Sequence, residues 1–304
     1  MKLVTSTGDF GIIENQEERL KHIYDAGFRH IDFCMYSKSE IAFITEDGWQ
    51  ERIEAYKKYA ENLGVSFLQA HSPDISSLCR EHTYEEAIEI TKRSFEVCRI
   101  LGIKNTVVHS FFCYETKEEF FEKNKEFYEK LLPCAKENEV NILVENSTSA
   151  NMGKNYPFAT GSDMKEFIKL VNHPYLHACW DTGHANIEGH QYDDIIALGE
   201  DLYAIHFNDN NGRGDRHQIP YLGNMSMDEV MCALVKIGYK GHFTFEAGNS
   251  VVNGRRRVPC SKKQSEKCEK LLEAPMCVYD DLEKILFKIG EHILKTYGLY
   301  EVEK

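Results

Sequence analysis

Short runs of β-branched and apolar residues alternate with longer stretches of helical period along the whole chain. Short apolar runs bounded by turn residues are typical of buried strands, whereas apolar positions three or four residues apart are typical of helices. The pattern predicts strands over residues 2–6, 30–35, 65–72, 105–110, 141–146, 176–182, 203–208 and 242–247, with helices between them.

Residues at the expected helix ends agree with this pattern. Thr83 stands where a helix would be capped, acidic residues follow it, and Gly102 stands where that helix would end. Comparable starts lie at Ser162 and Ser226, and comparable ends lie at Gly27, Gly64 and Gly238.

Repeated strand–helix units with no break in composition predict an α/β fold. We expect a (β/α)8 TIM barrel that forms a single domain over residues 1–304, with an open doubly wound sheet as the alternative. Residues 249–275 break the pattern with a polar, basic stretch that follows the last strand. We expect this stretch to be an irregular insertion near the barrel mouth, since the loops after the strands lie there.

The composition limits the classes of partner. The net charge of −13 disfavours nucleic acid and anionic membrane surfaces, because both repel an acidic protein. No stretch has the length and hydrophobicity of a signal peptide or a membrane span, so we expect a cytoplasmic location. Cysteines within predicted strands and helices (Cys34, Cys98, Cys134, Cys179 and Cys232) are expected to be buried reduced thiols. Pairing with a second copy of the chain stays open.

Metal-ligand residue types stand at the ends of the predicted strands. They are His71, His109, Glu145, Asp181, His206 and Glu246. In a TIM barrel the strand ends and the following loops form the open face that carries catalytic groups. Nitrogen and carboxylate donors without thiolate suit Zn²⁺, Mn²⁺, Co²⁺ or Mg²⁺. The residue types do not distinguish between these four ions. The sequence therefore predicts a divalent metal site at the barrel mouth.

Further polar residues follow two of these strands. His184 comes three positions after Asp181, and Asp215 and His217 belong to the stretch IHFNDNNGRGDRH at residues 205–217. These three are candidates for additional metal or substrate contacts. Asn208 and Asp209 could orient the ligands. Arg213 and Arg216, or the basic run at 255–257, could bind a phosphate or carboxylate, since arginine forms a bidentate fork.

The ordered motifs LVEN, WDTGHAN, AIHFND followed by DRH, and FTFEAGN resemble the xylose-isomerase-like superfamily of TIM barrels. This superfamily includes sugar-phosphate isomerases and epimerases and the type-IV apurinic endonucleases. In its epimerase and isomerase branch, the resemblance implies that Glu145, Asp181, His206 and Glu246 hold one divalent metal. It also implies that Glu145 and Glu246 exchange a substrate proton through an enediolate and that His184 contacts a substrate oxygen.

The endonuclease branch holds three zinc ions, and this resemblance implies a larger ligand set. Its members would be His71, His109, Glu145, Asp181, His184, His206, Asp215, His217 and Glu246. The acidic net charge speaks against DNA as the substrate. Our hypothesis is therefore a metal-dependent sugar or sugar-phosphate isomerase or epimerase acting on a small carbohydrate. The alternatives are an endonuclease-like phosphodiesterase, a lyase-type activity on a polyol or glycoside, and a binding barrel without catalysis.

Overall fold

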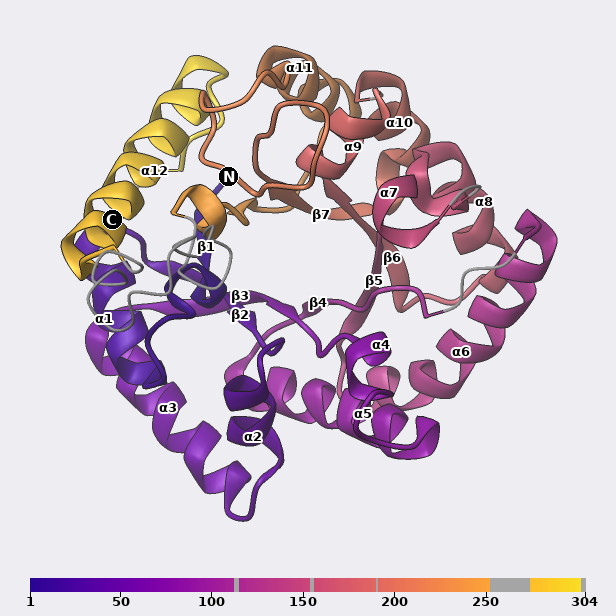
Figure 1. The fold of residues 1–304 in the computed structure, drawn as a ribbon, viewed down its shortest axis with the longest axis horizontal. Helices are drawn as coiled ribbons and strands as arrows, with labels where there is room; N and C mark the ends of the chain where they lie inside the picture. Colours follow the sequence, from indigo (N-terminus) through magenta and orange to yellow (C-terminus); the bar gives the residue numbers. More distant parts are fainter. Residues whose placement is uncertain (112–114, 154–155, 190, 252–273, 302–304) are drawn as a thin grey trace, which may run out of the picture.

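The computed structural model describes residues 1–111, 115–153, 156–189, 191–251 and 274–301. Over these residues the parallel strands form a closed barrel in sequence order, because β1 pairs with both β2 and β8 (Figure 1). The strands are β1 (Leu3–Ser6), β2 (His30–Cys34), β3 (Ser66–His71), β4 (Asn105–Val107), β5 (Asn141–Glu145), β6 (Leu176–Asp181), β7 (Leu202–Phe207) and β8 (Phe243–Phe245). The predicted TIM barrel is confirmed, and closure excludes the open sheet.

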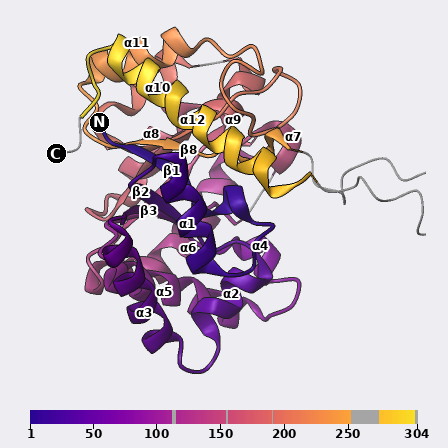
Figure 2. The ribbon, with the colours of Figure 1, turned by 90° about the vertical axis from the view of Figure 1, so that its left-hand side faces the viewer.

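Each strand is followed by a helix that covers the outside of the barrel (Figure 1). These helices are α1 (Gln16–Ala26), α3 (Trp49–Leu63), α5 (Tyr84–Leu101), α6 (Lys117–Glu137), α8 (Gly161–Val171), α10 (Tyr192–Leu198), α11 (Met227–Ile237) and α12 (Met276–Thr296). Figure 2 shows α12 beside α1, and the amine of Met1 lies 3.1 Å from Glu301 Oε1. The last helix thus closes the ring against the first.

Shorter helical segments lie in the connections. They are α2 (Lys38–Thr45), α4 (Ile75–Leu78), α7 (Ser149–Met152), α9 (Thr182–Glu188), and the 3-10 turns η1 (Thr7–Phe10), η2 (Pro157–Ala159), η3 (Gly199–Asp201) and η4 (Gly248–Ser250). The α segments in this set all follow the C-terminal end of a strand. They therefore help to shape the rim of the mouth.

The predicted strands lie in the right places, but several strands in the structure end before the predicted last residue. β4 ends at Val107 and β8 ends at Phe245, so the residues expected to close them lie in the following loops. The hydrogen bonding between β7 and β8 is long at the end of β8. The amide of Glu246 donates to the carbonyl of Phe207 at 3.4 Å, and the chain then turns into η4. His109 and Glu246 thus follow their strands.

Most predicted helix ends are confirmed. Thr83 and Glu86 form a reciprocal capping box at the start of α5, and Gly102 ends it with φ of 83°, which favours glycine. Gly27, Gly64 and Gly238 end α1, α3 and α11. The predicted start at Ser162 was wrong, because the Thr160 side chain caps α8 by accepting from Asp163 N.

An apolar layer fills the barrel beneath the predicted ligands. Val107, Leu143, Cys179 and Ala204 come from β4, β5, β6 and β7 and form one buried cluster. Each lies two positions before a predicted ligand, and residues two apart in a strand point to the same face. The predicted ligands Glu145, Asp181 and His206, which lie within these strands, therefore point to the same side of the wall as the apolar layer.

The cysteines differ in part from the expectation. Cys98 and Cys179 are buried, Cys34 and Cys134 are half-buried, and all four are free thiols. Cys232 was predicted to be buried but is exposed on α11, because it lies on the helix face away from the barrel. Residues 252–273, which hold most of the predicted insertion and the basic run at 255–257, lie outside the described residues. None of the described helices is long and apolar enough to cross a membrane.

Candidate active site

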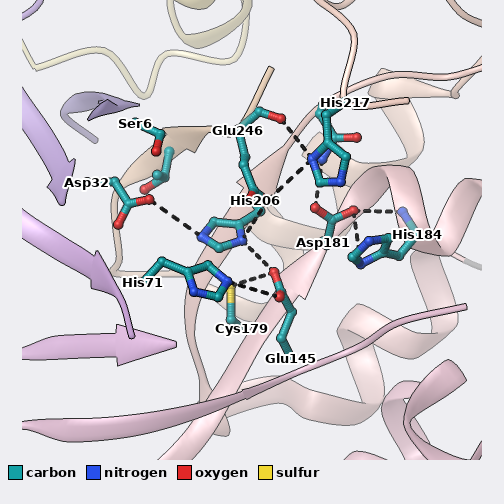
Figure 3. A network of polar contacts seen from close by, with 12 residues as sticks. Ser6, Asp32, His71, Glu145, Cys179, Asp181, His184, His206, His217 and Glu246 are labelled. Carbon is teal, nitrogen blue, oxygen red and sulfur yellow. Dashed lines mark hydrogen bonds and ion pairs between the residues drawn. The ribbon is translucent and has the colours of Figure 1, made fainter. Parts of the chain in front are cut away.

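A cavity of about 560 Å³ opens at the C-terminal ends of the strands. Most of the predicted ligands line it, namely His71, His109, Glu145, His184, Asp215, His217 and Glu246. Asp181 and His206 lie deeper and are fully buried. The structure thus brings all nine residues to the mouth of the barrel, as Figure 3 shows for most of them.

The four residues predicted to hold one metal form a compact group. One ligand atom from each of Glu145, Asp181, His206 and Glu246 lies within 4.8 Å of every other. His206 Nδ1 contacts Glu145 Oε1 and lies 3.1 Å from Glu246 Oε2 (Figure 3). One histidine and three carboxylates that converge from β5, β6, β7 and the loop after β8 suit a divalent ion.

A second group shares Glu145. His109 Nε2 lies 2.7 Å from Glu145 Oε2, and His71 Nε2 lies 3.8 Å from the same oxygen. The two Nε2 atoms are 3.2 Å apart. Glu145 therefore stands between two sets of nitrogen donors, with His206 on its other oxygen.

A third group lies on the far side of Asp181. The carboxylate of Asp215 contacts both histidines of this group. Its Oδ2 lies 3.2 Å from His184 Nε2, and its Oδ1 lies 2.8 Å from His217 Nε2. His217 has a left-handed backbone with φ of 43°, which is strained for a residue with a side chain. The loop after β7 thus holds an unfavourable conformation that places His217 over the cavity.

The orientation of the imidazoles suits metal binding. Nδ1 of His71 donates to the carbonyl of Ser72 at 3.1 Å, and Nδ1 of His184 donates to that of Asn146 at 2.8 Å. His217 Nδ1 lies 3.1 Å from the carbonyl of Glu246. A neutral ring that donates from Nδ1 has its lone pair on Nε2, and such backbone partners are typical of ligating histidines. The donor set therefore fits a metal.

The charges within the site are strongly coupled. Burial raises the pKa of Glu246, but His206 and His217 outweigh it and lower that pKa to about 2. Burial lowers the pKa of His184, but the carboxylates of Asp181 and Asp215 raise it to about 9. Without a metal, protons on the histidines balance the carboxylates. A bound cation takes the place of these protons, since ligating histidines must be deprotonated.

The remaining predicted residues have separate places. Asn208 Nδ2 donates to Asp181 Oδ2 at 2.7 Å, so Asn208 can orient this predicted ligand. Asp209 instead accepts from the backbone amides of Tyr221, Gly223 and Met225 and shapes the loop after β7. Arg213 and Arg216 are exposed and do not line the cavity. The structure therefore does not bring these arginines to the nine-residue cluster.

Several polar residues near the ligands escaped the sequence reasoning. The hydroxyl of Tyr36 lies 3.2 Å from His109 Nδ1, and the Asn146 side chain accepts from the amide of Asp181 at 2.6 Å. Asp32 and Gln69 lie inside the barrel and are buried. Their signal is a polar residue between apolar ones in a strand, as in Ile31-Asp32-Phe33, which a scan of strand ends does not detect.

Solved structures of known proteins share this fold. A D-tagatose 3-epimerase-like protein matches with a TM-score of 0.73 at 18% identity, covering 98% of each chain. A D-psicose 3-epimerase crystallised with D-fructose matches with a TM-score of 0.69 at 18% identity, covering 97% of this chain and 99% of the other. An L-ribulose 3-epimerase matches with a TM-score of 0.72 at 18% identity, covering 98% of this chain and 96% of the other.

Comparisons of sequence identify the family to which the chain belongs. The uncharacterized protein y4fM of Sinorhizobium fredii is 24% identical over 262 residues, which cover 76% of this chain and 81% of y4fM. The uncharacterized protein MJ1311 of Methanocaldococcus jannaschii is 32% identical over 93 residues, which cover 30% of this chain and 32% of MJ1311. The model of the xylose isomerase-like TIM barrel family matches residues 20–266. With its closed barrel and its cluster of ligands at the mouth, the chain belongs to the xylose isomerase-like TIM barrel family.

Proposed function

We propose that this protein is a divalent-metal-dependent isomerase or epimerase of a sugar or sugar phosphate. The observation that carries the proposal is the group of Glu145, Asp181, His206 and Glu246, whose ligand atoms lie within 4.8 Å of one another beside an open cavity. The structural neighbours named as 3-epimerases of tagatose, psicose and ribulose support the same class of substrate.

The two glutamates carry the chemistry in this proposal. A divalent ion in the group supplies Lewis-acid polarisation of a substrate carbonyl and its neighbouring hydroxyl, which acidifies the adjacent C–H bond. The carboxylate of one glutamate, Glu145 or Glu246, removes this proton, and the electrons of the C–H bond form the enediolate. The other glutamate, in its protonated form, donates its proton to carbon, and exchange with solvent restores both carboxyl groups to their starting states. His184 lines the same cavity and contacts a substrate oxygen.

Glu145→Gln and Glu246→Gln test this mechanism. An amide cannot accept the carbon-bound proton, so each variant should lose about 100-fold or more of the wild-type rate of solvent deuterium incorporation into a ketose. The rate is measured by NMR on the protein loaded with each divalent metal, over a panel of ketoses and ketose phosphates. Exchange at the wild-type rate in both variants would exclude the mechanism.

Glu283→Gln is the matched control for the same change. Glu283 is buried on α12 and bonds the hydroxyl of Thr5, so its carboxylate faces the outside of the barrel wall and not the cavity. The variant should keep the wild-type exchange rate. A loss equal to that of the two cavity variants would mean that burial of an amide, and not loss of a proton acceptor, explains the effect.

Phosphodiester hydrolysis with several metals is the second candidate. The observation that favours it is the presence of two further groups of donors, His71 with His109 on Glu145 and His184 with His217 on Asp215. Elemental analysis of protein purified without chelator separates the candidates. One metal per chain supports the isomerase, whereas three zinc ions together with cleavage of abasic duplex DNA support the phosphodiesterase.

A further inference from the structure

The layer of side chains inside the barrel, beneath the predicted ligands, is apolar on one side of the barrel and polar on the other. It is apolar on β4, β5, β6 and β7, where Val107, Leu143, Cys179 and Ala204 form a buried cluster. The strands β2, β3 and β8 instead place Asp32, Gln69 and Thr244 at buried positions. Their fractional exposures are 1%, 3% and 0%, so these polar groups have only each other and their neighbours as partners.

This polar side faces a single ligand, His206. The amide nitrogen Nε2 of Gln69 lies 2.8 Å from Nε2 of His206, across the barrel from β3 to β7. The hydroxyl of Thr244 donates to Oε1 of Gln69 at 3.2 Å. Asp32 Oδ2 lies 4.0 Å from the same His206 nitrogen, on the side of the ring away from Glu145 (Figure 3).

The two ring nitrogens of His206 have different partners. The Gln69 amide lies at Nε2, whereas Nδ1 faces Glu145 and Glu246. A metal bound by the four-residue group meets Nδ1, which must then hold a lone pair. The ring proton then stands on Nε2 and needs an acceptor, because buried donors are rarely left unpaired.

We propose that Gln69 is a positioning residue that accepts the Nε2 proton of His206 and so keeps the Nδ1 lone pair of this ring directed at the metal. A half turn of the amide brings Oε1 to His206 Nε2 as the acceptor. Thr244 serves both orientations, because its hydroxyl donates to the amide oxygen in one and accepts from the amide nitrogen in the other. This inference rests on the metal site of the proposed function and adds a residue that contacts neither metal nor substrate.

Gln69→Met tests the role, since methionine has a similar length and no hydrogen-bonding amide. Loss of an outer partner of a ligating histidine typically weakens metal affinity about 10- to 100-fold, and we expect a loss of this size for Zn²⁺. Titration calorimetry on chelator-treated protein measures it with Zn²⁺ alone. Gln191→Met is the matched control, because Gln191 is also a buried amide with both ends bonded, to Trp180 Nε1 and to the carbonyl of Thr182.

The ring proton itself gives a readout that a loss of packing would not move. Two-bond ¹H–¹⁵N spectra of histidine-labelled protein report the tautomer, and His206→Gln identifies the signals of this ring. With Zn²⁺ bound, the wild type should carry the His206 ring proton on Nε2, hydrogen-bonded to Gln69. In Gln69→Met this proton has lost its acceptor, so its ¹H signal should shift upfield and exchange faster with water.

Thr244→Val keeps the test decisive if Gln69→Met does not fold. It removes only the hydroxyl that holds the Gln69 amide, so the Zn²⁺ affinity should fall in the same direction and by less. A wild-type Zn²⁺ affinity and a wild-type signal of the His206 Nε2 proton in Gln69→Met, or in Thr244→Val where the first does not fold, would overturn the inference, as would an equal loss in Gln191→Met. Normal Zn²⁺ binding without turnover of any sugar would refute the proposed function and leave this inference standing. A wild type that binds none of Zn²⁺, Mn²⁺, Co²⁺ and Mg²⁺ would refute both.

Discussion

Gly183, within the motif Trp180–Asn186, lies where no side chain fits. A Cβ atom at this position would stand 1.9 Å from Asn208 Oδ1 and 2.9 Å from its Cγ. Asn208 in turn donates to Asp181, a predicted metal ligand. The glycine therefore allows α9 and the end of β7 to approach closely enough for Asn208 to hold Asp181.

Gly183→Ala should weaken the site through Asn208. The methyl group displaces the Asn208 amide from Asp181, so metal affinity should fall, and overpacking of this kind costs about 1–3 kcal/mol of the free energy of unfolding. Calorimetry with Zn²⁺ and urea unfolding measure the two effects. Gly214→Ala is the control, because its Cβ would meet only Arg216 Nε, at 3.9 Å. Wild-type values in Gly183→Ala would contradict the role given to Asn208.

The candidate ligands at strand ends could be found from the sequence, because histidine, aspartate or glutamate recurs at the end of successive predicted strands. His71, Glu145 and Asp181 are the last residues of β3, β5 and β6. Gln69 could not be assigned in this way. Its partner His206 is 137 positions away on the opposite wall, and the sequence does not show which strands face each other across a barrel.

At the scale of elements, a buried ion pair joins α1 to α2. Arg19 on α1 is fully buried and contacts Glu40 on α2, which is 2% exposed. Arg19 also donates from Nε to the carbonyl of Ile13 at 2.6 Å. Glu40 Oε2 accepts from the amides of Tyr36 and Ser37 at 2.9 Å and 2.7 Å. The pair thus fixes the segment that places Tyr36 against His109.

Removal of either partner should be costly. Arg19→Met leaves the Glu40 carboxylate buried without its cation, and Glu40→Gln does the reverse to Arg19. Each single change should lower the free energy of unfolding by about 3–5 kcal/mol. The double variant should lose clearly less than the sum, because it leaves no uncompensated charge. Urea unfolding of the four proteins measures the cycle. Strictly additive losses would show that the two side chains do not act as a pair.

The long elements were predictable, whereas the short rim helices were not. Periodicity over a helix such as α5, from Tyr84 to Leu101, is a strong local signal. Helices α4, α7 and α9 span only four to seven residues and depend on contacts from elsewhere. The amide of Ser149 at the start of α7, for example, is bound by Glu188 at the end of α9. No local pattern encodes such a contact.

For the whole molecule, the closed barrel followed from the even succession of strands and helices. Closure itself depends on a long-range contact, because β1 must pair with β8 some 240 residues later in the chain. In this pairing Leu3 lies beside Phe243 and Thr5 lies beside Phe245. The local pattern fits an open sheet equally well. What favoured closure was the number and regularity of the units, which an open doubly wound sheet with its reversal of strand order rarely shows.

The base of the barrel, opposite the mouth, holds a pair of neutral histidines. His30 begins β2, and His242 directly precedes β8. Burial, followed by the charge of Lys2, lowers the pKa of His30 to about 4. Burial, followed by the charges of His30 and Lys2, lowers the pKa of His242 to about 4 as well, although Glu301 partly opposes both shifts. These rings are therefore uncharged in the folded protein at neutral pH.

This pair should make the barrel sensitive to mild acid. A histidine whose pKa is about 4 when folded and 6.5 when unfolded binds more protons in the unfolded state between these values. Its contribution is fully present above pH 6.5 and is lost as the pH falls towards 4. For the two histidines together, the free energy of unfolding should fall by about 2–4 kcal/mol after allowance for their partial contact with solvent.

Urea unfolding from pH 7 to 4, with chelator present to keep the protein metal-free, should show this decline. His30→Asn combined with His242→Asn should flatten it, because asparagine does not titrate, whereas His292→Asn on the exposed face of α12 should leave the slope unchanged. An equal slope in the double variant and the wild type would assign the acid sensitivity to other groups.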